Sequence, residues 1–291
     1  MMDGVINICK PKGITSFDVV YKIKKLLNTG KVGHAGTLDP MATGVLPVCV
    51  GKATKIIDYI MHNEKTYGVS LKLGMVTDTY DLEGKIIEEK ECLSISDNLI
   101  LDTINSFVGI QKQIPPMYSA IKVNGKKLYE LARKGITIER EAREITIYSI
   151  DNILINKPSI SFDVKCSKGT YIRSLCYDIG NRLNCGATMT ELTRKNNGSF
   201  SIEDSINIDE LNNDNISNFI IPMERALGSY KKFIIEDKFC NLLINGVCIA
   251  DPQLLNKVID DNIYRVFSKE DELIGLGQKN IKGFKLLKLL I

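Results

Sequence analysis

The stretch Gly33–Val48 constrains this chain most, and it reads Gly-His-Ala-Gly-Thr-Leu-Asp-Pro-Met-Ala-Thr-Gly-Val-Leu-Pro-Val. Glycine admits backbone conformations that other residues avoid. Pro40 favours an extended conformation at Asp39 and ends any helix before it. We therefore predict a rigid, irregular loop that holds the single carboxylate, Asp39, in a fixed pose, with a buried strand over 45–50 behind it. Constrained loops often carry function, although Asp-Pro and glycine-rich runs also mark ordinary surface turns.

The 291-residue chain has a globular composition, 44% hydrophobic and 25% charged, and its length suggests one large domain or two unequal ones. It has no apolar run long enough to span a bilayer. We expect no signal peptide, because the first residues lack the basic and apolar regions of one. The eight cysteines occur singly, without the C-x-x-C pair of a zinc ribbon or redox centre. We expect reduced, mostly buried thiols of a cytoplasmic protein.

The formal net charge of +3 is only a weak basic bias. The distribution is more informative, because basic residues gather in short clusters while acids concentrate elsewhere, as at 88–91. A fold could gather the clusters on one face and so attract nucleic acid, but a surface of mixed charge is an equal alternative. The clusters are Lys24-Lys25, Lys126-Lys127, Arg133-Lys134, Arg140 with Arg143, Arg194-Lys195 and Lys231-Lys232.

Hydrophobic periodicity predicts an α+β fold in which most strand pairs are antiparallel. Apolar residues at helical spacing predict helices over 16–27 (capped by Ser16), 53–61, 96–107, 127–134 and 171–183. Alternating or continuous apolar runs predict strands over 5–8, 45–50, 67–73, 145–147 and 160–166. Pro115-Pro116 opens a distinct segment in which 123–126 is typical of a tight turn. Beyond an asparagine-rich zone at 207–218, turn residues at 244–247 and 274–277 predict short strands in a β-rich module from about Ser229.

Three further segments carry residues suited to chemistry. In Cys166–Arg173 a strand end, a glycine turn and a helix start follow one another, which puts Arg173 in the first helical turn. A cation there opposes the positive end of the helix dipole, so we expect Arg173 to serve an acid or a phosphate. Tyr67 begins a predicted strand, where the residue pattern alone favours a role in filling the core, and Lys10-Pro11 could be a simple turn.

Six blocks of the sequence together resemble the TruB family of tRNA pseudouridine synthases, in that family's order and spacing. They span essentially the whole chain and are Asn7–Pro11, Gly33–Pro47, Glu64–Tyr67, Leu73-Gly74 with Thr77–Thr79, Pro115-Pro116 with Tyr118–Ala120, and Cys166–Arg173. The resemblance implies the pseudouridine synthase fold over residues 1–228, with a mostly antiparallel mixed sheet and an RNA-binding lid insertion over 115–143. It also implies a small C-terminal β-rich, PUA-like RNA-binding domain over 229–291.

The resemblance further implies the reaction, which is isomerisation of uridine to pseudouridine at position 55 in the T loop of tRNA. The base is flipped out and its C–N glycosidic bond is exchanged for a C–C bond. Atoms are conserved, so no cofactor is expected, and the sequence shows no P-loop, dinucleotide fingerprint or metal-ligand cluster. By resemblance, Asp39 is the nucleophile or stabilises a cationic sugar, and Arg173 keeps it ionised. Tyr67 would stack on the flipped uracil and offer its hydroxyl as an acid or base.

Four more residues are implied to bind RNA or the base. His34 would fill the space left by the extruded base, Leu192 would supply an apolar wall, Tyr171 would contact RNA, and Lys10 would support the floor of the site. Ala35 departs from the threonine common in the family motif.

The implied partner is the T arm of tRNA, bound by a cytoplasmic monomer with no obligate protein partner and no membrane. Two alternatives stay open. One is a related catalytic subunit directed by a guide RNA and partner proteins. The other is an RNA-folding or RNA-binding protein whose catalysis is secondary or lost.

Overall fold

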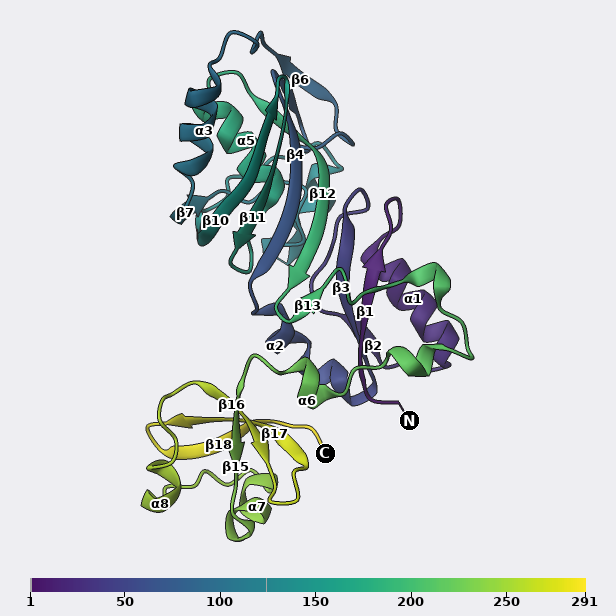
Figure 1. Ribbon diagram of the computed structural model, residues 1–291, viewed down its shortest axis with the longest axis vertical. Coiled ribbons are helices and arrows are strands. Elements are labelled where there is room, and N and C mark those ends of the chain that lie inside the picture. The colour runs from purple at the N-terminus through teal and green to yellow at the C-terminus, as the bar shows by residue number, and fades with distance from the viewer. Residues whose placement is uncertain (1, 124) are drawn as a thin grey trace.

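The computed structural model describes residues 2–123 and 125–291, and a ten-stranded mixed sheet forms most of it (Figure 1). The strand order is β14 (Ile206–Asn207), β1 (Gly4–Lys10), β3 (Thr43–Val50), β12 (Ala187–Asn197), β4 (Lys65–Leu73), β11 (Ser159–Cys166), β10 (Arg143–Asn156) and β7 (Gly109–Gln113). Two short strands, β2 (Val32–His34) and β13 (Phe200–Ser201), pair with β3 and β12. Among the described residues of this sheet, the strand pairs β1–β14 and β3–β12 are parallel and the others are antiparallel, which confirms the predicted fold class.

Helices α3 (Asp97–Asn105) and α5 (Ile172–Arg182) pack on the half of the sheet that holds β4, β10 and β12. The alternation in β4 is as predicted, since Tyr67, Val69, Leu71 and Leu73 are all buried. Ser96 caps α3 by accepting a hydrogen bond from the Leu99 amide. Leu99 itself is exposed, so it does not belong to the buried face that its spacing predicted.

Helix α1 (Ser16–Leu27) has the predicted range, but its cap is Thr15 and not Ser16. The Thr15 hydroxyl accepts a hydrogen bond from the Asp18 amide, and the Thr15 amide donates to the Asp18 carboxylate. Ser16 is buried, and its hydroxyl exchanges hydrogen bonds with the amide (2.8 Å) and the carbonyl (3.1 Å) of Leu38. The start of α1 is therefore attached to the glycine-rich loop just before Asp39.

Several predicted elements are shorter or divided. The helix expected over 53–61 is a 3₁₀ turn, η1 (Gly51–Ile56), followed by α2 (Ile57–Met61). The basic helix expected over 127–134 is only α4 (Leu128–Ala132), before Gly135 in a left-handed conformation. Strands β8 (Lys122–Val123) and β9 (Lys126–Lys127) pair on either side of the turn predicted at 123–126, of which Asn124 lies outside the described residues. The remaining short elements are β5 (Met75–Thr77), β6 (Ile86–Glu89), η2 (Ile208–Glu210), η3 (Ile216–Phe219) and α6 (Met223–Ala226).

The C-terminal part forms a second sheet with its own apolar core. Its strands are β15 (Lys231–Ile234), β16 (Ile263–Phe267), β17 (Leu273–Asn280) and β18 (Gly283–Leu289), with helices α7 (Asp237–Ile244) and α8 (Pro252–Leu255). The turn predicted at 244–247 is present, because Asn245-Gly246 form a turn that ends α7. The turn predicted at 274–277 was wrong, because these residues lie within β17. A Cβ on Gly275 would lie 2.2 Å from the Lys288 carbonyl and one on Gly277 2.6 Å from the Phe284 ring. These glycines permit close packing.

Two general expectations can be compared with the described residues. All eight cysteines are free thiols, and five of them are buried. Within 2–123 and 125–291, no helix is long and apolar enough to cross a membrane. Leu276 of β17 and Leu290, which follows β18, pack in one apolar cluster with Val5 and Ala53, so a second cluster, separate from the core of the C-terminal sheet, joins that sheet to the large one.

We expect Gly44→Ala to destabilise the fold strongly. Gly44 has φ +100°, and an added Cβ would lie 2.3 Å from the Arg194 carbonyl oxygen, so main chain must move to admit it. Gly13 has a similar φ of +91° but no atom within 4 Å of the added Cβ. Urea unfolding should show a loss of roughly 3 kcal/mol or more for Gly44→Ala and about 1–2 kcal/mol for Gly13→Ala. Equal losses would show that the close approach of Arg194 is unimportant.

Candidate active site

The glycine-rich loop between β2 and β3 brings Asp39 to the first turn of α5. Arg173 Nε lies 3.0 Å from Asp39 Oδ2. The Arg173 side chain is only 8% exposed, whereas that of Asp39 is 36% exposed. The pair therefore joins a buried, fixed cation to a carboxylate that remains open to a bound molecule. The structure brings together the acid and the arginine that the sequence placed in one site.

Three further acceptors fix the guanidinium of Arg173. Its Nη1 donates to Asp81 Oδ2 and to the Thr79 carbonyl, each at 3.3 Å, and its Nη2 donates to the Tyr118 carbonyl at 2.8 Å. Asp81 is buried and also accepts a 2.5 Å hydrogen bond from the Thr79 hydroxyl. One guanidinium thus lies between two carboxylates, an arrangement whose geometry a planar, multidentate donor can satisfy.

Sequence reasoning missed Asp81. It lies two residues beyond the quoted block Thr77–Thr79, and acids are usually exposed. The available signal was the alternation Thr77-x-Thr79-x-Asp81, because both threonine hydroxyls donate to atoms of Asp81.

Burial is the main influence on the Asp39 carboxyl. Although part of the side chain is open, the surrounding protein desolvates it and raises its pKa, and the nearby Asp81 acts in the same direction. The Arg173 guanidinium and, more weakly, Lys10 oppose this rise in pKa. Asp39 is therefore a carboxylate whose ionisation depends on its arginine partner.

Lys10 lies under the loop and is fully buried. Its ammonium donates to the carbonyls of Pro11 and Ile14, each at 2.8 Å, and of Pro40 at 3.3 Å. Burial lowers the Lys10 pKa to about 8, against an opposing effect of Asp39. Lys10 therefore ties the residue after Asp39 to β1, a position that suits a support of the site floor.

Arg194 is a second buried cation, and its assignment to a surface cluster with Lys195 was wrong. It is 1% exposed, with Nε donating to the Val45 carbonyl (2.7 Å) and Nη2 to the Gly36 carbonyl (3.0 Å). Gly36 lies in the irregular loop and Val45 lies in β3, so the buried guanidinium joins the loop to the strand by hydrogen bonding one main-chain carbonyl of each. Lys195, one residue on, faces outward and pairs with Asp163.

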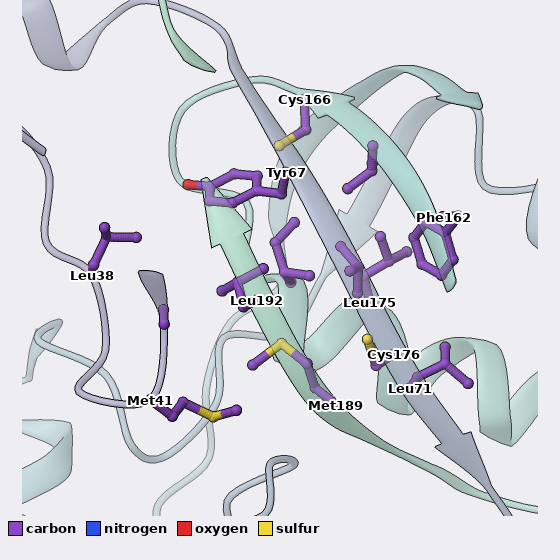
Figure 2. Packing of buried hydrophobic residues seen from close by; sticks show 14 of the residues in the cluster. Leu38, Met41, Tyr67, Leu71, Phe162, Cys166, Leu175, Cys176, Met189 and Leu192 are labelled. Atoms are coloured by element: carbon purple, nitrogen blue, oxygen red, sulfur yellow. The ribbon is translucent and has the colours of Figure 1, made fainter. Parts of the chain in front are cut away.

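Tyr67 and Leu192 form an apolar flank beside the loop. Both are nearly buried and belong to the core cluster that includes Leu38 and Met41. Figure 2 shows the Tyr67 oxygen directed towards the side of the loop that carries Leu38, with Leu192 and Met189 below the ring. Burial raises the pKa of the Tyr67 phenol. The wall is therefore apolar, with one neutral hydroxyl at its edge.

His34 and Tyr171 lie at the ends of elements around the site. The half-buried His34 ends β2, and its Nδ1 has no hydrogen-bond partner among the described residues. Burial lowers the His34 pKa, with Arg194 acting in the same direction, so the ring is neutral. The Tyr171 main chain exchanges two hydrogen bonds with the Gln113 side chain just before α5, and burial raises the pKa of its phenol.

The segment 115–143 reaches the site through the Tyr118 carbonyl, the acceptor for Arg173. Arg140 Nη1 donates to the Pro115 carbonyl at 3.0 Å, which links the two ends of the segment. Lys127 Nζ and the Arg133 guanidinium carbon each lie 5.4 Å from the Tyr129 ring centroid. This basic segment is thus joined to the arginine that holds Asp39.

Fold comparisons place this architecture in a known class. The chain is similar to a chain in a crystal structure of a Cbf5–Nop10–Gar1 complex, with a TM-score of 0.75 and 29% identity over 99% of this chain and 85% of that one. It is also similar, with a TM-score of 0.73 and 27% identity over the same shares, to a chain of an H/ACA RNP bound to a substrate RNA containing 2′-deoxyuridine.

Sequence comparisons define the class further. Residues 24–172 match the TruB family pseudouridylate synthase N-terminal domain, and residues 173–228 match the tRNA pseudouridylate synthase B C-terminal domain. Both matches contribute strands to the large sheet. The fold and sequence thus define a pseudouridine synthase.

The chain belongs to the TruB family, which confirms the resemblance found in the sequence. It is 57% identical over 290 residues to tRNA pseudouridine synthase B of Clostridium tetani, covering 100% of both chains. It is 45% identical over 296 residues to the protein of that name from Alkaliphilus oremlandii, covering 99% of both.

Proposed function

We propose that this protein isomerises uridine to pseudouridine at position 55 in the T loop of tRNA. The observation that carries the proposal is the 3.0 Å pair between Asp39 and Arg173, in which the cation is buried and the carboxylate is open. The full-length relatives named tRNA pseudouridine synthase B support the substrate class.

The reaction needs one carboxylate and no external atoms. The N1–C1′ bond breaks, the uracil turns, C5 bonds to C1′, and the proton from C5 leaves while N1 takes one up. Asp39 either bonds to C1′ or stabilises the positive charge that develops on the sugar. Arg173 keeps Asp39 ionised in a site that excludes water, and its bonds to Asp81 and Tyr118 hold that pair in one orientation.

The positions of the side chains around Asp39 suggest a role in catalysis or RNA binding for each. Tyr67 stacks on the flipped uracil and offers a neutral hydroxyl for proton transfer, while Leu192 closes the apolar wall. His34, neutral and with an unpartnered Nδ1, fills the space left by the base. Tyr171 contacts the RNA at the start of α5, and Lys10 supports the loop from below.

Two larger surfaces would hold the RNA. We assign the insertion 115–143 to a lid over the T arm, because it is basic and contacts Arg173 through Tyr118. We assign residues 229–291 to a PUA-like RNA-binding domain, beside a catalytic domain over 1–228. In this proposal the protein acts in the cytoplasm as a monomer without an obligate partner.

The direct test uses the purified protein, alone, with an isolated T-arm hairpin. We expect full conversion of one uridine per hairpin. Carbodiimide mapping would detect the pseudouridine, as would chromatography of the digested nucleosides, which separates it from uridine of equal mass. A requirement for a guide RNA or a second protein would overturn the proposal. So would binding of the hairpin without any turnover.

Single-turnover rates should fall as the pH is lowered. Chemistry needs the Asp39 carboxylate, and burial raises the pKa of this group. The active form is therefore present above that raised pKa and is lost as the pH falls through it, at a higher pH than the ordinary aspartate value of about 4. Rates at saturating enzyme between about pH 4 and 8 would show this limb. A rate independent of pH down to the ordinary value would contradict it.

Turnover should persist in excess EDTA without any added cofactor. The reaction conserves atoms, and Asp39 and Arg173 provide both charges that the proposal uses. The assay should compare EDTA with a magnesium-free buffer that keeps the hairpin folded. Loss of turnover on chelation, with recovery on adding zinc, would show that the assignment omits a metal.

A further inference from the structure

Two exposed aromatic side chains lie on the outer face of α1. Phe17 is 66% exposed and Tyr21 is 64% exposed, and their spacing of one helical turn puts both rings on one face. The helix is anchored by a different face, formed by Ser16, Val19, Val20 and Ile23. Core packing therefore does not explain these rings, and neighbouring exposed apolar groups often mark an interaction surface.

The charge beside the rings identifies the kind of partner. Lys24 and Lys25 continue the same face, and neither forms an ion pair within the described residues. The acid on this helix, Asp18, is occupied in the cap with Thr15. Two exposed rings followed along the helix by unpaired lysines form the type of platform that binds unpaired nucleotides, since bases stack on the rings and phosphates attract the lysines.

Helix α1 is attached to the catalytic loop through its buried face and the residues just before it. Ser16 bonds the main chain of Leu38, and the Gly13 amide donates to the Pro40 carbonyl at 2.8 Å. The segment from Gly13 to Ser16 is thus hydrogen bonded to the residue before Asp39 and to the residue after it. Arg173 approaches Asp39 from α5, and Figure 1 shows α1 and α5 on opposite sides of β1 and β3. RNA that extends beyond the target nucleotide, away from the lid, would reach α1.

We propose that Phe17, Tyr21, Lys24 and Lys25 bind unpaired nucleotides of the substrate tRNA that lie outside its T arm. The two rings stack on bases and the two lysines contact phosphates. The proposal rests on the proposed function, because it assumes that tRNA is the substrate. It predicts that full-length tRNA gains affinity from a surface that an isolated T-arm hairpin does not touch.

The test compares Phe17→Ser/Tyr21→Ser with the unaltered protein on two RNAs, unmodified tRNA and the T-arm hairpin. We expect the affinity for tRNA to fall by about tenfold or more, from the loss of one or two base stacks. Turnover of the hairpin should stay within about twofold, because the rings are outside the site. Phe17→Tyr/Tyr21→Phe should keep full affinity for tRNA. The matched control is Ile110→Ser, on β7, where the side chain is similarly exposed at 70%.

A second variant tests the lysines. Lys24→Gln/Lys25→Gln should reduce the salt dependence of tRNA binding by a slope of roughly 1 to 2, with no change for the hairpin. Unchanged tRNA affinity in the ring variant would overturn the proposal. Equal losses on both RNAs would also overturn it and make α1 a support for the loop. A dimer in sedimentation that becomes monomeric in the ring variant would identify a second copy as the occupant instead. If the unaltered protein converts neither RNA, the proposed function is wrong. The effect of the ring variant on tRNA affinity would still test whether α1 binds tRNA.

Discussion

Asp39→Asn should abolish pseudouridine formation while tRNA binding stays within about threefold of wild type. The amide is nearly the same size, so the loop keeps its shape, but it carries no negative charge. It can neither bond to C1′ nor stabilise a cationic sugar. Single-turnover rates at saturating enzyme should fall by roughly 10³-fold or more.

The fold provides the control for this variant. Asp39 is partly exposed, and Arg173 keeps three other acceptors, so the unfolding midpoint in urea should change little. Residual turnover within about tenfold of wild type would remove Asp39 from the chemistry.

Arg173→Lys should be almost as damaging as Arg173→Ala. In the native protein one planar guanidinium reaches Asp39, Asp81 and two main-chain carbonyls. Lysine keeps the charge but has one nitrogen, which cannot satisfy that arrangement. Asp39 then loses both its fixed orientation and part of the interaction that lowers its pKa. We expect single-turnover rates to drop by roughly 10²-fold or more in both variants.

Both variants also leave the buried Asp81 with fewer partners, which destabilises the fold. Rates should therefore be measured well below the thermal midpoint of each variant, with the folded fraction determined by circular dichroism. If Arg173 instead contacted only phosphate, the lysine variant would recover at saturating RNA. Near-normal rates for Arg173→Lys under saturation would contradict the role of the Asp39–Arg173 pair.

Local patterns predicted much of the fold. Alternation identified β4 and β11, and the helical spacing of apolar residues identified α1 and α5 close to their observed bounds. The glycines and prolines identified the loop around Asp39, and the motif blocks linked it with Arg173. These features are encoded in neighbouring residues, so one sequence is enough to recognise them.

The rest depends on contacts between distant segments. Arg194 looks like a surface cation in sequence, and only the carbonyls of Gly36 and Val45 explain its burial. Asp81 is a site residue because α5 places Arg173 against it. Gly275 looks like a turn residue in the sequence but lies in β17. A glycine is needed at this position because the Lys288 carbonyl leaves no room for a Cβ. Tertiary packing decides the environment of all three residues, and the periodicity of the sequence carries no information about that packing.

Nucleotide-resolution mapping of pseudouridine in a tRNA transcript, after incubation with the purified protein alone, would show whether this protein modifies position 55 and whether Asp39 is required. The transcript should start without any modification, and the Asp39→Asn protein should be the parallel sample. We expect stoichiometric pseudouridine at position 55 with the native protein and none with the variant. Pseudouridine at another position, or the same yield from Asp39→Asn, would contradict it.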